Sequence, residues 1–252
     1  MKKTALLLTT AILTFGIIQT IAQPGRMPGG PRFDGAMSKL FGENTSFSAD
    51  IESQIKEKSG DMTTMPGKIF FNAGNTRFEM NLSSVSGPRM RPEAAAQMKA
   101  MGLDQMIAIS RPDKNLSYLI YPGFESYVEN QLPDAKTGTN DAYKVETTEL
   151  GKETVAGHPC VKNKVIVTDS KGKTNESTVW NATDLKNFPM KIVHNDQDND
   201  VTMLFKNVSL SKPAAALFEA PSGYHSYNNM QSLMQEQMMK HMGGGMSQPP
   251  GQ

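Results

Sequence analysis

Residues 141–224 constrain the fold most, because they alternate strand-like segments with turns and contain no catalytic motif. The segments are rich in Val, Ile, Thr and aromatic residues, and polar turns at residues 170–173 and 195–200 separate them. This pattern is typical of an antiparallel sheet that offers a surface or a cavity. It predicts an architecture more directly than it predicts a reaction.

The N-terminus has the layout of a cleaved export signal. Two lysines precede an apolar run over residues 5–21, and the small residue Ala22 stands before a Gln-Pro-Gly stretch. We therefore expect cleavage after Ala22 and a periplasmic or secreted protein with no transmembrane segment in its mature form. The alternative is an uncleaved membrane anchor.

Charge and cysteine content exclude several classes of function. The formal net charge of +1 gives no electrostatic reason to expect a nucleic acid partner. Cys160 is the single cysteine, so no disulfide can form within the chain. Its place at the start of a strand favours a buried structural thiol, with a redox or metal thiol and a mixed disulfide as the alternatives.

The composition divides the chain into four parts. Residues 1–22 form the signal peptide, and residues 23–45 form an arm rich in Gly and Pro that we expect to be flexible. Residues 46–227 form a β domain. Residues 228–252 form a Met-rich helix followed by a disordered Gly/Pro tail.

The predicted fold class is α+β, mainly antiparallel β. We expect about ten strands in a curved sheet or half-open barrel, wrapped around a short helix, with a further helix at the C-terminus. Good helix formers between a proline and a glycine predict the interior helix over residues 92–101. The expected strands cover residues 47–55, 68–72, 76–82, 106–110, 116–121, 125–129, 143–150, 161–168, 176–181, 190–194 and 201–208.

Several stretches resemble a known superfamily. The first strand FSADIESQI, the hairpins GKIFFNAGNTRFEMNL and MIAISRPDKNLSYLIYP and the closing LFEAPSGY look like the periplasmic lipoprotein carriers of the Lol type. The stretches VAGHPCVKNKV, STVWNATDLKNFPMKI and FEAPSGY resemble an uncharacterised secreted family placed near those carriers. The resemblance covers residues 46–227. It implies a curved sheet around a helix, with an apolar cavity that in the carriers shields acyl chains.

The resemblance and the strand pattern together predict a non-enzymatic protein that binds a hydrophobic ligand, without a cofactor. The ligand would be a lipid or an acylated protein, and envelope proteins are further possible partners. The alternative is a structural interaction domain whose core is filled by its own side chains. Strand alternation nominates these cavity-lining residues: Phe47, Ile51, Phe71, Phe78, Met80, Ile107, Tyr118, Ile120, Trp180, Ile192, Met203 and Phe205.

The C-terminal methionines offer a second functional hypothesis. Thioethers and imidazole suit Cu(I), so Met234, Met238, His241 and Met242 are candidate ligands of a Cu(I) site. The same spacing predicts an amphipathic helix over residues 228–241, and a stripe of methionines at helical spacing packs on a core or a partner more often than it binds a metal.

Enzyme signatures are weak. The four histidines are scattered, and neither a zinc-protease pattern nor a nucleophile elbow is present. Asp196, Asp198 and Asp200 resemble the start of a calcium loop. Because the central glycine and the distal glutamate of such a loop are missing, these residues indicate a solvated hairpin turn.

Overall fold

The computed structural model describes residues 35–88, 90–132, 143–195 and 199–243, all of which belong to one unit of the chain. The predicted signal peptide, the first part of the predicted arm and the end of the tail lie outside the described residues. The same holds for Asp196 and Asp198.

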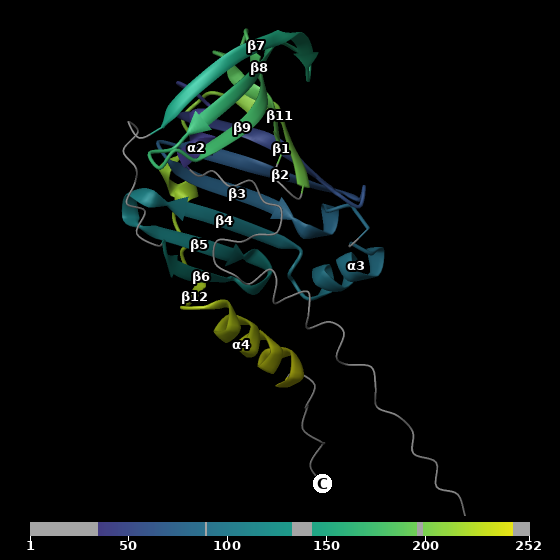
Figure 1. Cartoon of the computed structure of the whole chain (residues 1–252). Helices are drawn as coiled ribbons and strands as arrows, with labels where there is room; N and C mark the ends of the chain where they lie inside the picture. The colour runs from purple at the N-terminus through teal and green to yellow at the C-terminus, as the bar shows by residue number, and fades with distance from the viewer. Residues whose placement is uncertain (1–34, 89, 133–142, 196–198, 244–252) are drawn as a thin grey trace, which may run out of the picture. The chain divides into compact units, whose positions relative to one another are not determined.

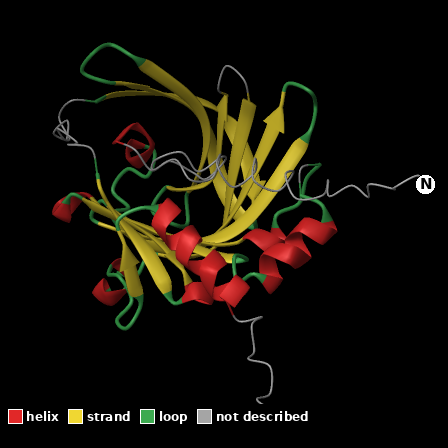
Figure 2. Cartoon of the chain, turned by 90° about the horizontal axis from the view of Figure 1, so that it is seen from below, coloured by secondary structure: helices red, strands yellow, loops and turns green. Residues whose placement is uncertain are grey.

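One open sheet of twelve strands dominates the described part of the chain (Figure 1). The strands lie in the order β12-β6-β5-β4-β3-β2-β1-β11-β10-β9-β8-β7, and every neighbouring pair is antiparallel except β12 and β6, which are parallel. The prediction of a mainly antiparallel fold is confirmed. Figure 2 shows how strongly the sheet bends.

The sheet consists of two meanders in which strands adjacent in sequence are adjacent in space. The first meander contains β1 (Ser46–Glu57), β2 (Met62–Asn72), β3 (Asn75–Asn81), β4 (Gln105–Arg111), β5 (Leu116–Tyr121) and β6 (Ser126–Gln131). The second contains β7 (Lys144–Val155), β8 (His158–Thr168), β9 (Thr174–Ala182), β10 (Phe188–Asn195) and β11 (Asn199–Ser209). Pairing of β1 with β11 joins the two, and the short β12 (His225–Tyr227) completes the other edge.

Helices are few. They are α2 (Gly35–Lys39), α3 (Pro92–Ala100), α4 (Met230–Gly243) and the 3-10 turns η1 (Leu82–Ser84), η2 (Pro112–Lys114), η3 (Pro122–Phe124) and η5 (Ala215–Phe218). The predicted interior helix is found as α3, and the predicted C-terminal helix as α4. None of the α3 residues is buried, whereas α4 packs against β6 and β12 and buries Leu233.

Two tight hairpins show why the sequence turns where it does. Ala73 and Gly74 connect β2 to β3, and Ala156 and Gly157 connect β7 to β8, all four with positive φ. Two-residue loops with positive φ at both positions match the right-handed twist of the flanking strands. Each alanine therefore sits in a left-handed conformation that costs it free energy.

The register of the strands separates an inner from an outer face of the sheet. We define the inner face by Phe47 and Ile51 of β1 and by Phe205 of β11, which lies opposite Ile51. Directly opposed residues share a face, and successive residues alternate between faces. Glu52, next to Ile51, therefore belongs to the outer face.

The inner face of β1, β2 and β8–β11 closes around α2 and the turn that follows it. Phe41, in that turn, is 2 % exposed. Its ring lies 4.9 Å from the ring of Phe47, 5.6 Å from that of Phe188 and 5.7 Å from that of Phe205. The helix inside the bend is thus α2, which the sequence did not predict, and the expected arm ends in a packed segment.

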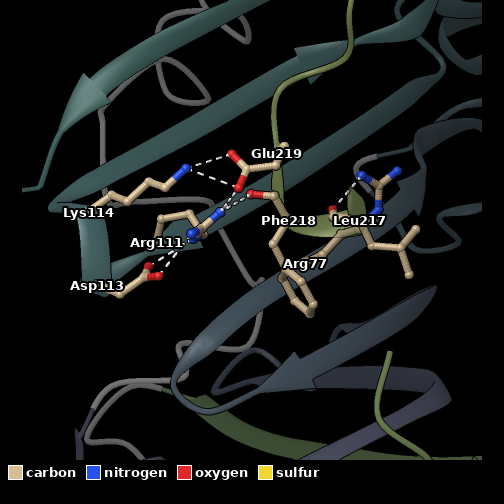
Figure 3. A network of polar contacts seen from close by, with 7 residues as sticks. All are labelled: Arg77, Arg111, Asp113, Lys114, Leu217, Phe218 and Glu219. Carbon is tan, nitrogen blue, oxygen red and sulfur yellow. Dashed lines mark hydrogen bonds and ion pairs between the residues drawn. The ribbon is translucent and has the colours of Figure 1, made fainter. Parts of the chain in front are cut away.

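The outer face of β3–β6 is covered by the segment of residues 210–224, which we call the strap. Phe218 of the strap is buried against Ile109, Tyr118 and Ile120. Arg111 donates hydrogen bonds to the Phe218 carbonyl and to the Glu219 carboxylate, and Arg77 donates to the Leu217 carbonyl (Figure 3). The strap is therefore held by an apolar anchor and two guanidinium groups.

Two carboxylates complete the polar contacts of Arg111 with the strap, and we call this set of contacts the clamp. Asp113 accepts two hydrogen bonds from Arg111, both of 2.8 Å, and the pairing lowers the pKa of Asp113 to about 2. Hydrogen bonds from Arg111 and then from Lys114 lower the pKa of Glu219. Both carboxylates are half-exposed, so each ion pair is screened by solvent and contributes modestly to stability.

Candidate functional site

The residues nominated from strand alternation do not all share one face. By register, the inner face carries Phe47, Ile51, Phe71, Phe78, Met80, Ile192, Met203 and Phe205. The outer face carries Ile107, Tyr118, Ile120 and Trp180. Tyr118 and Ile120 pack under the strap. Trp180 lies between Lys162 and Lys191, whose ammonium groups are 5.0 Å and 4.5 Å from its ring centroid.

Much of the inner face is filled. Ile51, Ile192 and Met203 are between 0 % and 2 % exposed, as are the rings of Phe47, Phe188 and Phe205 around Phe41. These side chains pack against one another and against α2, so they form a core rather than the wall of an open cavity.

A row of apolar residues on the inner face of the first meander is less covered. Phe78, Ala108 and Leu119 lie opposite one another on β3, β4 and β5, and all three are only partly buried. The row continues into the buried Ile69 on one side and Val128 on the other. Half-covered apolar surface of this kind extends the hydrophobic part of the inner face beyond its packed core.

A cavity of about 300 Å³ lies between the turn after α2 and the inner face of β7–β9. Its floor is apolar and formed by Leu40, Phe41, Val165 and Val179, and the half-exposed Val145 of β7 stands at its edge. Polar residues line the remainder: Lys39, Glu43, Asn44, Thr147, Asn181, Lys186 and Asn187. Apolar and polar groups thus share one small space.

Side-chain amides hold the two loops at this cavity in place. Asn44, 7 % exposed, donates to the carbonyls of Phe41 and Lys186, at 3.0 Å and 3.1 Å. Asn181 donates to the Asn187 carbonyl at 2.9 Å. Lys186 and Asn187 both have positive φ, so these amide contacts stabilise an otherwise costly turn. The two loops at the cavity, which we call its rim, are therefore held in place by contacts within the chain.

A larger groove, of about 440 Å³, crosses the outer face over β1–β4. Its floor is backbone at Ile51, Gly67 and Met80, between two cross-strand rows of outer-face side chains. These rows include Asp50, Glu52, Lys68, Glu79 and Lys206. Any sheet face with long side chains has such grooves, and an apolar ligand here would have to desolvate charges. Its size alone does not make it the better site.

None of the residues nominated from strand alternation lines the inner cavity. Sequence reasoning missed its strand residues, Val165 and Val179 among them, as well as the residues that come from outside the strands. Lys39–Asn44 belong to the segment expected to be flexible, and Lys186 and Asn187 belong to a turn. The apolar pair Leu40-Phe41, standing inside a polar stretch, was the one signal that could have placed this turn against the core.

Reactive groups do not converge at the cavity. Cys160 is 3 % exposed, and burial raises the pKa of its thiol, which favours the structural reading. His158 pairs with Asp184 at 2.9 Å. Among the described residues, no three His, Cys, Asp or Glu side chains gather closely enough to hold a metal ion.

The C-terminal methionines lie in α4. Met234 is partly buried and Met238 is 44 % exposed, whereas the side chains of His241 and Met242 lie outside the described part of the structure. The Cu(I) hypothesis therefore stays a prediction. No helix in the described ranges is long and apolar enough to cross a membrane.

Comparison with known proteins gives a family and a set of similar structures. The model of a domain of unknown function, DUF4412, matches residues 54–188. No curated protein matches the chain. Among solved structures, the lipoprotein LppX of Mycobacterium tuberculosis is similar at 10% identity, covering 71% of this chain and 93% of its own, with a TM-score of 0.40.

Two further structures extend the comparison. LprF of Mycobacterium bovis is 14% identical, covers 75% of this chain and 94% of its own, and has a TM-score of 0.40. The LolA superfamily protein NE2245 of Nitrosomonas europaea is 9% identical, covers 73% and 94%, and has a TM-score of 0.37. The resemblance to the Lol-type superfamily and to an uncharacterised family, predicted from the sequence, is found again here.

Proposed function

The chain belongs to the DUF4412 family, whose function is unknown, and we propose that it is an exported, non-enzymatic protein that binds a hydrophobic ligand on the inner face of its sheet. The signal-like residues 1–22 support export. The cavity between the turn after α2 and β7–β9 carries the proposal. It is a preformed space whose floor is made of Leu40, Phe41, Val165 and Val179.

The physical driving force is burial of apolar surface. Each methylene transferred from water into such a cavity contributes about 0.8 kcal/mol, and no titrating residue is needed for it. A volume of about 300 Å³ lies at the lower end of the range for ligand pockets. The site therefore suits one short acyl or similar apolar chain, free or attached to a protein, rather than several chains.

The filled core favours a second candidate, a structural envelope domain without a small ligand. Its support is the packing around Phe41, which leaves Phe47, Phe188 and Phe205 fully buried. The two candidates differ in one measurable property, since only the first requires that an apolar compound enter the cavity.

The test is native mass spectrometry of the mature chain titrated with dodecanol, a neutral twelve-carbon compound. Val145→Asp places a charge at the cavity edge, and we expect it to weaken binding about tenfold, the equivalent of one lost apolar side-chain contact. Leu150→Asp is the matched control. Leu150 lies on the same strand and is 53 % exposed, against 44 % for Val145, and it does not line the cavity.

Unchanged binding by Leu150→Asp together with weakened binding by Val145→Asp supports the proposal. Failure of the unsubstituted chain to bind dodecanol contradicts it and favours the structural domain. Equal loss in both variants also contradicts it, because the effect would then come from the strand rather than from the cavity.

A further inference from the structure

The helix α4 lies beside β6 and β12 at one edge of the sheet and packs through one stripe of residues (Figure 1). Leu233 and Gln237, four residues apart, are 0 % and 9 % exposed. Residues four apart on a helix lie one above the other on the same side. This stripe is therefore the side of α4 that packs against the rest of the chain.

A second stripe begins one residue later and is turned by about 100° around the helix axis. It contains Met234, which is partly buried, and Met238, which is 44 % exposed. The helical spacing of the methionines therefore does not serve to pack Met238 on the sheet, because Leu233 and Gln237 take that place. The Met238 side chain is accessible from solvent.

The other soft donors of this stretch surround Met238 in the helix. Met234 stands four residues before it, His241 three residues after it and Met242 four residues after it. These are the positions whose Cβ atoms lie about 5–6 Å from a central residue on a helix surface. Two ligands four residues apart on one helix bind a shared ion in zinc proteases. Helical spacing thus brings three thioethers and one imidazole to one side of α4.

These donors are neutral and soft, a combination that favours Cu(I) over ions that prefer oxygen ligands, such as Mg²⁺. The one carboxylate in the sequence of α4, Glu236, is turned by about 200° from Met234 and pairs with Lys240 at 2.8 Å. We propose that this side of α4 is a Cu(I) site centred on Met238. The site is separate from the inner cavity and does not depend on the proposed function.

The test is an anaerobic titration of the mature chain with Cu(I), in competition with a colorimetric Cu(I) chelator. Met238→Leu removes the central thioether and keeps a side chain of similar size and helix propensity. Met239→Leu is the matched control. Met239 is the next residue, is 59 % exposed against 44 % for Met238, and is turned by about 100° from it.

We expect the unsubstituted chain to bind one Cu(I) and Met239→Leu to bind it with unchanged affinity. Met238→Leu should weaken binding at least about tenfold, because loss of a residue that only supports a metal ligand already costs about 10- to 100-fold. Met242→Leu, at a neighbouring position, should weaken binding as well. Excess Mg²⁺ should not displace the bound Cu(I).

Absence of Cu(I) binding by the unsubstituted chain overturns the proposal. Unchanged affinity in Met238→Leu also overturns it, since the ion would then be held elsewhere in the chain. Equal loss in Met238→Leu and Met239→Leu overturns it too, because a site centred on Met238 requires these adjacent residues to differ. None of these outcomes bears on the hydrophobic ligand, since Met238 does not line the inner cavity.

Discussion

The sheet buries apolar side chains in two separate places, on the outer face of the first meander and on the inner face that both meanders share. In β4 and β5 the buried residues Ile109, Tyr118 and Ile120 point outward and are sealed by the strap. In β9–β11 the buried residues Val179, Ile192 and Phe205 point inward and are covered by α2 and Phe41. A single continuous sheet can therefore have two separate cores, and which side of a strand is apolar does not indicate which side of the sheet is concave.

Truncation of Phe41, which covers the inner core, should have the largest effect on stability. Phe41→Ala deletes a ring that contacts four other phenylalanine rings, and we expect a loss of about 3–5 kcal/mol in the free energy of unfolding. Chemical denaturation measures it. A loss below about 1 kcal/mol would mean that the inner core does not depend on this segment.

Truncation of Phe218, through which the strap covers the outer core, should destabilise the fold less. Phe218→Ala should lower the free energy of unfolding by about 2–3 kcal/mol, because the strap lies at the surface and can collapse into the space left. Hydrogen exchange should show lost protection in β3–β6 and unchanged protection in β8–β11. Equal loss in both regions would show that the two cores act as one.

The clamp on the strap can be tested without touching either core. Arg111→Met removes the hydrogen bonds to Phe218 and Glu219 but keeps an apolar stem, and we expect a loss of about 1–3 kcal/mol. Lys114→Met removes an exposed partner of Glu219 and should cost at most about 1 kcal/mol. If both substitutions cost the same, the buried guanidinium has no special role.

Acid should weaken the same clamp. The pKa of Asp113 is lowered in the folded chain, so its pairing with Arg111 stabilises the fold above the unfolded pKa of about 4 and is lost as the pH falls towards about 2. Glu219 contributes with the same sign. The stability difference between the unsubstituted chain and Arg111→Met should therefore shrink between pH 5 and pH 2 in denaturant titrations, within a window of about three pH units. A constant difference would exclude an electrostatic clamp.

The smallest expected effect comes from two equivalent substitutions, one in a hairpin of each meander. Ala73→Gly in the first meander and Ala156→Gly in the second relieve the same left-handed strain, so each should raise the free energy of unfolding by about 0.5–1 kcal/mol. Thermal unfolding of both variants gives the comparison. A large difference between them would show that one hairpin is strained by its surroundings.

Most of the sheet could be predicted from the sequence, because period-2 alternation and turn residues are local signals. The hairpin from Lys68 to Asn81 is an example, since both strands and the Ala73-Gly74 turn are found where the pattern predicts them. The three-residue β12 was not predicted, because such a short parallel strand depends on its partner rather than on its own residues.

The candidate site was harder to predict. Ile107, Tyr118 and Ile120 have the right alternation for a cavity wall, yet they lie on the outer face, because the strap, remote in sequence, provides their cover. Trp180 has a large apolar ring, yet it lies on the outer face, where it contacts two lysines and donates a hydrogen bond to Glu153. The cavity itself depends on Lys39–Asn44 meeting β7–β9, a long-range contact that no local pattern encodes.

Pairing of β1 with β11 has a consequence for how the chain reaches its native state. Each meander can form from contacts between neighbours, but Ile51 meets Phe205 only after more than half of the chain has been placed between them. Contacts of such large sequence separation cost much loop-closure entropy, which raises the free energy of the transition state and slows folding. Until β11 arrives, the edge of β1 stays open to pairing with other chains, so the last strand of the second meander governs both the folding rate and the risk of aggregation.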